Sequence, residues 1–281
     1  MWLIKPLKFS YTNAKCRAIK STLLDISVFE RLTNSATIGD IIIVIKDTPY
    51  GKFIKSVLQE SLGKGLDNYF LYLFEKITEK LSKKEKDIFF LFFMERENLR
   101  KRKKEIQQKP NAKELFKKLD MEYVTALKKN ITVLDRKDVK DLGVITGSYF
   151  NLINIITTVR LKFIYGYKKE NIFPFLIPFG SFTKKENIEK LLNMEKISQL
   201  HILFPSIFKK TVKDFTEMRK ALYRYHTETL KKVWLGFPFK LSVPFALLRL
   251  IEIEIKNIKA CIEGVRLGLP EEEIKRMLVG I

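Results

Sequence analysis

"IEIEIKNIKACIEGVRLGLPEEEIKRML", residues 251–278, is the stretch that decides the fold, because its first half fits two structures. Isoleucine alternates with charge as in a half-exposed β-strand, but the alternation fails at Asn257 and Ile258. Apolar residues instead recur at spacings of three and four over about five turns. This spacing is typical of an amphipathic α-helix. The stretch therefore predicts a long helix rather than a strand. The apolar residues that follow the helical period are Leu248, Ile251, Ile255, Ile258, Ile262 and Val265.

Two polar side chains, Glu254 and Asn257, flank this apolar stripe. Each must find a hydrogen-bond partner when the helix packs against its neighbours. Gly268 is a typical helix stop, and Pro270 predicts the start of another helix, since proline suits the first helical position. The glutamates at 271–273 favour the same start because negative charge suits the positive end of the helix dipole.

Composition favours a folded, helical protein with a strong positive charge. The chain has 281 residues, 46% of them hydrophobic, which is enough for one substantial core or two modest ones. Its 12 Gly and 9 Pro are few for an all-β protein, which needs frequent turns. The formal net charge of +21 is compatible with nucleic acid, an anionic membrane surface or an acidic protein as partner, although lysine-rich usage is also typical of thermophiles.

Further helix boundaries are predicted along the chain. A hydroxyl side chain with a carboxylate three residues later predicts helix starts at Ser27, Ser82 and Thr183. The glycines that predict helix stops are Gly63, Gly166, Gly236 and Gly268. In contrast, residues 40–51, "DIIIVIKDTPYG", are a β-branched run ended by a turn, and by themselves predict a strand.

Residues 82–109 predict one long helix with an apolar first half, closed by Pro110 and Asn111. Its second half carries a basic cluster at residues 100–104, the densest charge in the chain. Such a cluster is either a solvated helix face or a docking patch for phosphate or carboxylate groups.

No motif for catalysis, a cofactor or a metal is found. The sequence lacks a phosphate-binding P-loop and a nucleophile elbow, and neither His201 nor His226 begins a zinc motif. The two histidines are predicted to be surface or core residues, and Cys16 and Cys261 to be small buried hydrophobes. The chain is therefore not expected to be an enzyme or to bind a small-molecule substrate.

The N-terminal residues are not expected to form a signal peptide. The longest apolar stretches, around residues 87–96 and 152–166, are interpreted as too short or too charged to span a bilayer, which takes about 20 apolar residues. We therefore expect any contact with a membrane to be made from its surface.

An asparagine-headed helical pattern recurs in the chain. Residues 151–172, "NLINIITTVRLKFIYGYKKENI", place Asn154 where the opening stretch has Asn257, followed by more helix and a glycine stop. Residues 11–24, "YTNAKCRAIKSTLL", again start from an asparagine, Asn13, and continue as a basic amphipathic helix. The recurrence indicates internal repeats.

Taken in order, several segments resemble the C subunits of A/V-type ATP synthases, a family that includes the d subunit of the vacuolar ATPase. The segments span nearly the whole chain: residues 11–24, 45–51 ("IKDTPYG"), 152–163 ("LINIITTVRLKF"), 176–188 ("LIPFGSFTKKENI") and 252–278.

The resemblance implies an all-α fold of three similar helical lobes that form a funnel around a pseudo-threefold axis. It implies a single all-helical domain over residues 1–281, with repeats at approximately 1–110, 111–200 and 201–281, and makes residues 40–51 helical. The implied role is that of a non-catalytic central-stalk component, on the cytoplasmic side of the membrane and peripheral to it. Its expected partners are the proteolipid rotor ring and the central-shaft subunits, with the membrane surface close by, and the complex translocates protons or sodium ions.

For such a stiff adaptor, seven residues are candidates for lobe packing or partner contact. We expect them to hold adjacent helices in register through hydrogen bonds and ion pairs; the alternative is that they are helix caps and solvated charges. They are Asn13, Arg17, Asn154, Arg160, Lys162, Glu254 and Asn257. The alternative function is that of a basic helical protein that binds nucleic acid. The resemblance disfavours nucleic acid as a partner.

Overall fold

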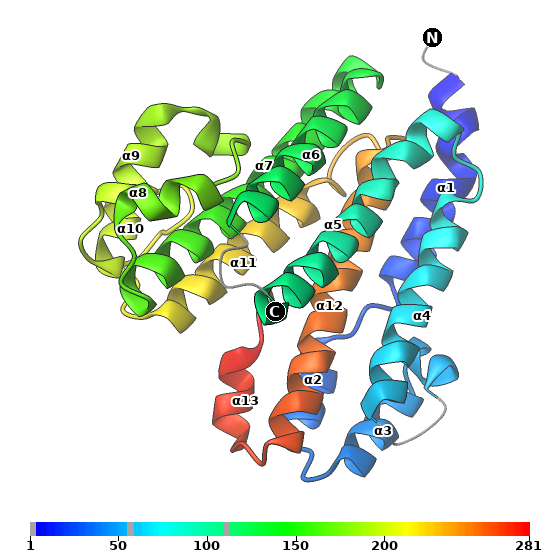
Figure 1. Ribbon diagram of the computed structural model, residues 1–281. Coiled ribbons are helices and arrows are strands. Elements are labelled where there is room, and N and C mark those ends of the chain that lie inside the picture. Colours follow the sequence, from blue (N-terminus) through cyan, green and yellow to red (C-terminus); the bar gives the residue numbers. More distant parts are fainter. Residues whose placement is uncertain (1–3, 55–58, 109–112) are drawn as a thin grey trace. The chain divides into compact units, whose positions relative to one another are not determined.

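The fold is all-α (Figure 1). The computed structural model describes residues 4–54, 59–108 and 113–281, and within these ranges it consists of α-helices joined by loops and short 3-10 or π-helical turns, with no β-strand. The prediction of an all-α fold is confirmed.

The chain divides into two compact units. The first unit combines Met1–Leu81 with Leu230–Ile281, and the second is Ser82–Thr229. These bounds differ from those of the three predicted repeats. The repeats describe a recurring sequence pattern rather than compact units, so they stay a prediction.

The first unit is built around α12 (Ser242–Arg266), which contains most of the opening stretch. Most of its apolar stripe is buried, including Ile251, Ile255 and Ile258, and the predicted helical period is confirmed. The elements that pack against α12 are α1 (Ile4–Lys20), α2 (Ile26–Thr33), α3 (Ile38–Lys46), α4 (Gln59–Thr78) and α13 (Glu271–Met277). In this unit α3 is followed by the 3-10 turn η1 (Pro49–Phe53).

The second unit is built around α7 (Arg136–Val159), which continues into the π-helical turn η2 (Arg160–Ile164). The long helices α5 (Lys83–Gln108) and α6 (Lys113–Thr132) pack together, and α6 also contacts α7. Shorter elements complete the unit: α8 (Lys169–Ile172), η3 (Phe173–Phe175), η4 (Gly180–Thr183), α9 (Lys185–Asn193), η5 (Ile197–Gln199), α10 (Leu200–Leu203) and α11 (Phe215–Lys232), whose last residues belong to the first unit.

The helical segment Arg136–Ile164 is, by length and composition alone, long and apolar enough to cross a membrane, with a mean hydropathy of 1.4 over its most apolar part. This helix begins well before the apolar stretch at residues 152–166, and over its full length it is long and apolar enough to span a bilayer. However, 67% of its most apolar part is buried inside the protein, which is typical of a core helix.

The predicted strand at residues 40–51 is wrong. Ile38–Lys46 forms α3, with a capping box between Thr37 and Asp40 at its start. Buried side chains recur at Ile41, Val44 and Ile45, which is a helical spacing, so packing overrides the β propensity of the isoleucines. The helix implied for this segment by the family resemblance is confirmed.

The predicted helix starts are confirmed in part. The backbone N–H of Ser82 donates to the Glu85 carboxylate at 2.9 Å, at the start of α5 as predicted. Ser27 instead lies inside α2, because Asp25 caps this helix by accepting from the N–H of Val28. Thr183 does not cap α9, which starts two residues later without a side-chain cap.

The remaining boundary predictions are mostly confirmed. Helix α13 begins directly after Pro270, which occupies the cap position rather than the first helical position. Gly166, Gly236 and Gly268 each follow a helix with a positive φ of 66°, 89° and 64°, as expected of helix stops. Gly63 was wrongly predicted to be a stop, because it lies within α4. The predicted closing residues Pro110 and Asn111 lie outside the described residues.

Candidate functional site

Asn257 fastens α12 to the C-terminal segment of the first unit. Its Nδ2 donates to the carbonyl oxygen of Val279 at 2.8 Å, and its Oδ1 accepts from the N–H of the same residue at 3.0 Å. The asparagine side chain is buried, so both of its polar atoms are satisfied without water. We call this pair of bonds to a single backbone residue an asparagine clasp.

The second unit contains the same arrangement. Asn154, on α7, is fully buried; its Nδ2 donates to the carbonyl oxygen of Ile177 at 2.8 Å, and its Oδ1 accepts from the Ile177 N–H at 2.8 Å. One turn earlier, Asn151 accepts from the N–H of Ser181 at 3.0 Å and donates to its hydroxyl at 3.0 Å. The segment that follows α8 is therefore attached to α7 at two successive points.

The two clasps occur in matching sequence settings. Each asparagine lies in the second half of the central helix of its unit, and its backbone partner lies 23 residues later for Asn154 and 22 residues later for Asn257. Between asparagine and partner come a glycine with positive φ and a short helix, α8 or α13. A second positive-φ glycine follows each partner, at Gly180 and Gly280.

Gly180 also shows how closely the clasped segment approaches α7. A Cβ added at this position would lie 2.7 Å from the carbonyl oxygen of Gly147 and 2.9 Å from Oδ1 of Asn151. Backbone packing this close requires glycine in addition to the positive φ.

Asn13, the third asparagine of the recurring pattern, does not form a clasp among the described residues. It lies on α1 and is half-buried, and its Oδ1 is buried without a hydrogen-bond partner in the described part of the chain. The recurring pattern thus gives two clasps with the same geometry and one asparagine whose oxygen is unpaired.

Glu254 joins three elements of the first unit. Its Oε2 accepts from the N–H of Leu24, in the loop before α2, at 2.7 Å. Its Oε1 accepts from the hydroxyl of Tyr50, in η1, at 2.6 Å. Since α12 lies in the last predicted repeat and both donors lie in the first, this carboxyl group connects distant parts of the chain. The prediction that Glu254 must find partners is confirmed.

Burial controls the ionisation of Glu254. Only 8% of the residue is exposed, and this burial raises the pKa of its carboxyl group to about 7, although the bonds from Tyr50 and Leu24 oppose the shift. Burial and the adjacent Glu254 carboxyl also raise the pKa of Tyr50 well above its usual value.

The three candidate cations have different environments. The ammonium group of Lys162, in η2, donates to the carbonyl oxygen of Leu192 at 2.6 Å, near the end of α9, and burial lowers its pKa. The guanidinium of Arg160 lies 5.5 Å from the ring centre of Phe215. Arg17 is exposed on α1 and makes no ion pair or side-chain hydrogen bond with the described residues. Only the first two cations connect elements.

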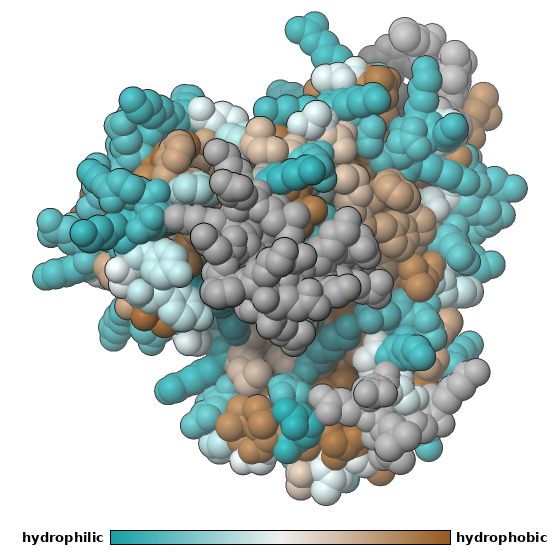
Figure 2. Space-filling view, in the orientation of Figure 1, coloured by the Kyte–Doolittle hydropathy of each residue, from teal (hydrophilic) through white to brown (hydrophobic). Residues whose placement is uncertain are grey.

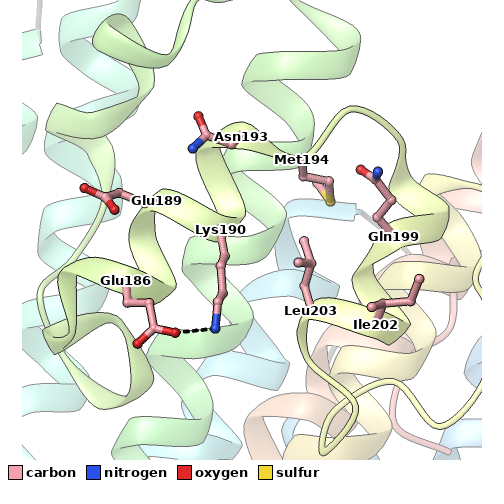
Figure 3. A pocket seen from close by; sticks show the side chains of 8 residues that line it. All are labelled: Glu186, Glu189, Lys190, Asn193, Met194, Gln199, Ile202 and Leu203. Atoms are coloured by element: carbon pink, nitrogen blue, oxygen red, sulfur yellow. Dashed lines mark hydrogen bonds and ion pairs between the residues drawn. The ribbon is translucent and has the colours of Figure 1, made fainter.

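An open depression of about 450 Å³ lies between α9 and α10 in the second unit (Figure 3). Its charged side chains include Lys190 and Glu186, which pair with each other. The lining residues are Glu186, Glu189, Lys190, Asn193, Met194, Gln199, Ile202 and Leu203. This set contains no nucleophile with an adjacent base.

Within the described residues, no three His, Cys, Asp or Glu side chains are placed to hold a metal ion. Cys16 and Cys261 are free and buried, and burial raises the pKa of each thiol to about 12, so both behave as the predicted small hydrophobes. His226 is a core histidine whose Nδ1 lies 2.7 Å from the hydroxyl of Ser148.

The surface over α8, α9 and α10 is largely hydrophilic on the face shown in Figure 2, where teal side chains line its outer edge. The basic cluster at residues 100–104 lies on α5 as predicted, but its side chains are outside the described set.

Sequence reasoning missed the partners of the candidate residues and one further asparagine. Asn151 lies three residues before Asn154 on the same helix, which was a readable signal. Tyr50 and Leu24 carried no such signal, because they come next to Glu254 only in the folded chain.

The sequence matches the family model described as "ATP synthase (C/AC39) subunit" over residues 12–98 and 97–277. The chain belongs to this family. The matched ranges contain all seven candidate residues, including the asparagines of both clasps.

Curated relatives agree with the family match. The chain is 21% identical to the C subunit of the A-type ATP synthase of Pyrococcus abyssi, in an alignment that covers 99% of this chain and 91% of the relative. It is 22% identical to the proteins of the same name from Desulfurococcus sp. and Thermococcus kodakarensis, with 99% of this chain and 92% of each relative covered. These alignments extend over nearly the full length of both chains, as expected of members of one family.

Proposed function

We propose that this chain links the central shaft of an A/V-type ATP synthase to its membrane proteolipid ring, and so passes rotation between ion flow and ATP chemistry. Membership of the family makes it a non-catalytic component of that complex. Its partners are then the shaft and ring subunits, and it acts at the cytoplasmic side of the membrane without spanning it. The proposal includes the three helical lobes arranged as a funnel.

The observation that carries the proposal is the recurrence of the asparagine clasp. A part that transmits torque must resist sliding of its helices, and a buried side chain with two bonds to one backbone residue opposes such sliding. Asn154 and Asn257 provide this restraint in the two units separately. The same recurrence supports the repeats, because related geometry follows each of the two asparagines.

Glu254 adds a restraint of another kind. A clasp binds a segment 22 or 23 residues further along the same stretch of chain, whereas Glu254 is bonded to residues 230 and 204 positions away. The bonds to Leu24 and Tyr50 thus join the beginning of the chain to its end within the first unit. This supports a stiff adaptor over the alternative of isolated caps.

Co-purification tests the assignment of partners. We expect the tagged full-length chain, isolated from its own cells in mild detergent at low salt, to bring with it the ATP-binding head, the shaft subunits and the proteolipid. The matched control is an untagged preparation carried through the same steps. A chain that never brings ring or shaft subunits, even at low salt, would contradict the proposal. Retention of nucleic acid with a steep salt dependence would favour the alternative function.

A further inference from the structure

A turn in the second unit exposes several large apolar side chains in a short space. It begins at the last residue of η2, includes α8 and ends at the first residue of η3, and all residues from 164 to 171 are exposed. Ile164, Tyr165 and Phe173 are 56%, 60% and 55% exposed, and Tyr167 is 44% exposed. We call residues 164–173 the tyrosine–lysine turn. Ile172 within the turn is buried, and the residues that flank the turn at 161–163 and 174–176 are only partly exposed.

The turn has a defined backbone conformation. The N–H of Tyr165 donates to the carbonyl oxygen of Arg160 at 3.1 Å, and the N–H of Tyr167 donates to that of Leu161 at 2.9 Å. Gly166, between the tyrosines, has a φ of 66° and open space around it. These bonds close the end of the helix and fix the backbone at both tyrosines.

Two lysines follow the tyrosines directly. Lys168 and Lys169 are exposed, and neither ammonium group makes a hydrogen bond or ion pair with the described residues. Only one acidic residue, Glu170, lies within the turn. The turn thus combines exposed aromatic and aliphatic side chains with unpaired positive charge.

The equivalent turn in the first unit has the opposite charge. It follows α12, contains Gly268 with a φ of 64°, and exposes 54% of Leu267. However, it contains no aromatic residue and continues into the glutamates at 271–273. Tyrosines and lysines are therefore not required by the geometry of such a turn, and those of the second unit need another explanation.

We propose that the tyrosine–lysine turn binds the anionic surface of a lipid bilayer. Tyrosine is enriched at the boundary between headgroups and acyl chains, where its ring contacts apolar groups and its hydroxyl stays hydrated. Ile164 and Phe173 add apolar surface, while Lys168 and Lys169 are complementary to anionic headgroups. Two lysines and a few apolar side chains predict weak, reversible binding. The inference stands apart from the coupling role, because it concerns lipid and is tested without the other subunits.

Vesicle sedimentation with the purified full-length chain tests this proposal. We expect the chain to sediment at low salt with vesicles of phosphatidylcholine and phosphatidylglycerol, but much less with phosphatidylcholine alone. The double variant Lys168→Gln/Lys169→Gln should weaken the binding roughly 25-fold, since each lysine near an anionic surface contributes a factor of about five. The double variant Tyr165→Ser/Tyr167→Ser should also weaken the binding. Higher salt should reduce the contribution of the two lysines to the vesicle affinity.

The matched control is Lys128→Gln/Lys129→Gln. Lys128 and Lys129 are exposed on the last turns of α6. Replacing both by glutamine changes the net charge by the same amount as the test variant. The pair lies near the start of α7, whose 24 residues place about 36 Å between it and the tyrosine–lysine turn.

Three results would overturn the proposal. The first is a wild-type chain that does not bind anionic vesicles at low salt. The second is an equal loss from both lysine pairs, which would make the binding a property of net charge alone. The third is an unchanged vesicle affinity of the tyrosine variant together with weaker co-purification of other subunits, which would assign the turn to a protein partner. Unchanged urea unfolding of each variant confirms that it is folded.

Discussion

Replacing Asn257 by alanine is expected to lower the free energy of unfolding by about 2–5 kcal/mol, because it leaves two buried polar groups unpaired. The N–H and the carbonyl of Val279 both lose their partner, and each unsatisfied buried group costs about 1–3 kcal/mol. Alanine's higher helix propensity recovers only about 0.6 kcal/mol. Asn154→Ala, which breaks the second clasp, is expected to have an effect of the same size.

Urea unfolding followed by circular dichroism measures the loss, and amide hydrogen exchange at Val279 reports on the clasp itself. The amide should exchange faster in Asn257→Ala, because its acceptor is gone. Asn68→Ala, at an exposed position of α4, serves as the matched control, and we expect it to raise the free energy of unfolding by about 0.6 kcal/mol through helix propensity alone.

Asn13→Ala provides a sharper contrast within the recurring pattern. Its Oδ1 has no partner in the described part of the chain, so its removal should not lower the free energy of unfolding and should raise it slightly, by about 0.6 kcal/mol, through helix propensity. If Asn257→Ala were as mild as Asn68→Ala, the clasp would not be a stabilising contact. An Asn13→Ala variant as damaging as the other two would contradict the assignment of only two clasps.

The second large effect is expected from Glu254→Gln, and it depends on pH. The pKa of Glu254 is about 7 in the folded chain, against an ordinary value of 4.5. The folded state therefore binds this proton more tightly than the unfolded state. The resulting stabilisation is fully present below pH 4.5 and is lost as the pH rises through 7, which amounts to about 3 kcal/mol for a shift of this size.

Glutamine does not titrate, so the variant does not lose this stabilisation as the pH rises. Its stability relative to the wild type should rise by about 3 kcal/mol between pH 4.5 and pH 8, measured as the difference between urea unfolding free energies at each pH. The amide can keep both contacts, since its oxygen can accept from Leu24 N–H and its nitrogen can donate to the Tyr50 oxygen.

Two further variants separate this effect from general acid sensitivity. Glu30→Gln removes an exposed carboxylate on α2 of the same unit, and its stability difference should change by less than about 0.5 kcal/mol over this range. Tyr50→Phe removes a hydrogen bond that lowers the pKa of Glu254, so the loss of stability should move to higher pH. A stability difference for Glu254→Gln that stays constant with pH would show that the carboxyl does not titrate in this range.

The residues around the clasps show what the sequence could and could not predict. The helix of α12 and the need of Glu254 and Asn257 for partners followed from periodicity, because a helix repeats every few residues and a buried polar group must be satisfied. The identity of those partners did not follow, since Val279 and Ile177 offer only backbone groups, which every residue has. Tyr50 is 204 residues from Glu254, beyond any local pattern.

The wrong predictions have local causes. In α3 the β-branched run has a strand-like composition, but its buried positions recur at a helical spacing. In α4 the helix continues through Gly63, where an added Cβ would meet no atom within 4 Å, so close packing does not explain this glycine. Two residues later close packing does require glycine, because a Cβ added at Gly65 would lie 2.6 Å from the carbonyl oxygen of Phe53. At α2 an aspartate two residues before Ser27 takes the cap position.

The proposed role of this chain, passing rotation between the shaft and the ring, is tested most directly by measuring coupling with and without it. The complete ATP synthase is reconstituted into sealed vesicles, and ATP hydrolysis and ATP-driven ion uptake are measured in the same sample. We predict that a complex stripped of this chain still hydrolyses ATP but takes up almost no ions, and that added wild-type chain restores uptake. Undiminished ion uptake per ATP in the stripped complex would contradict this role.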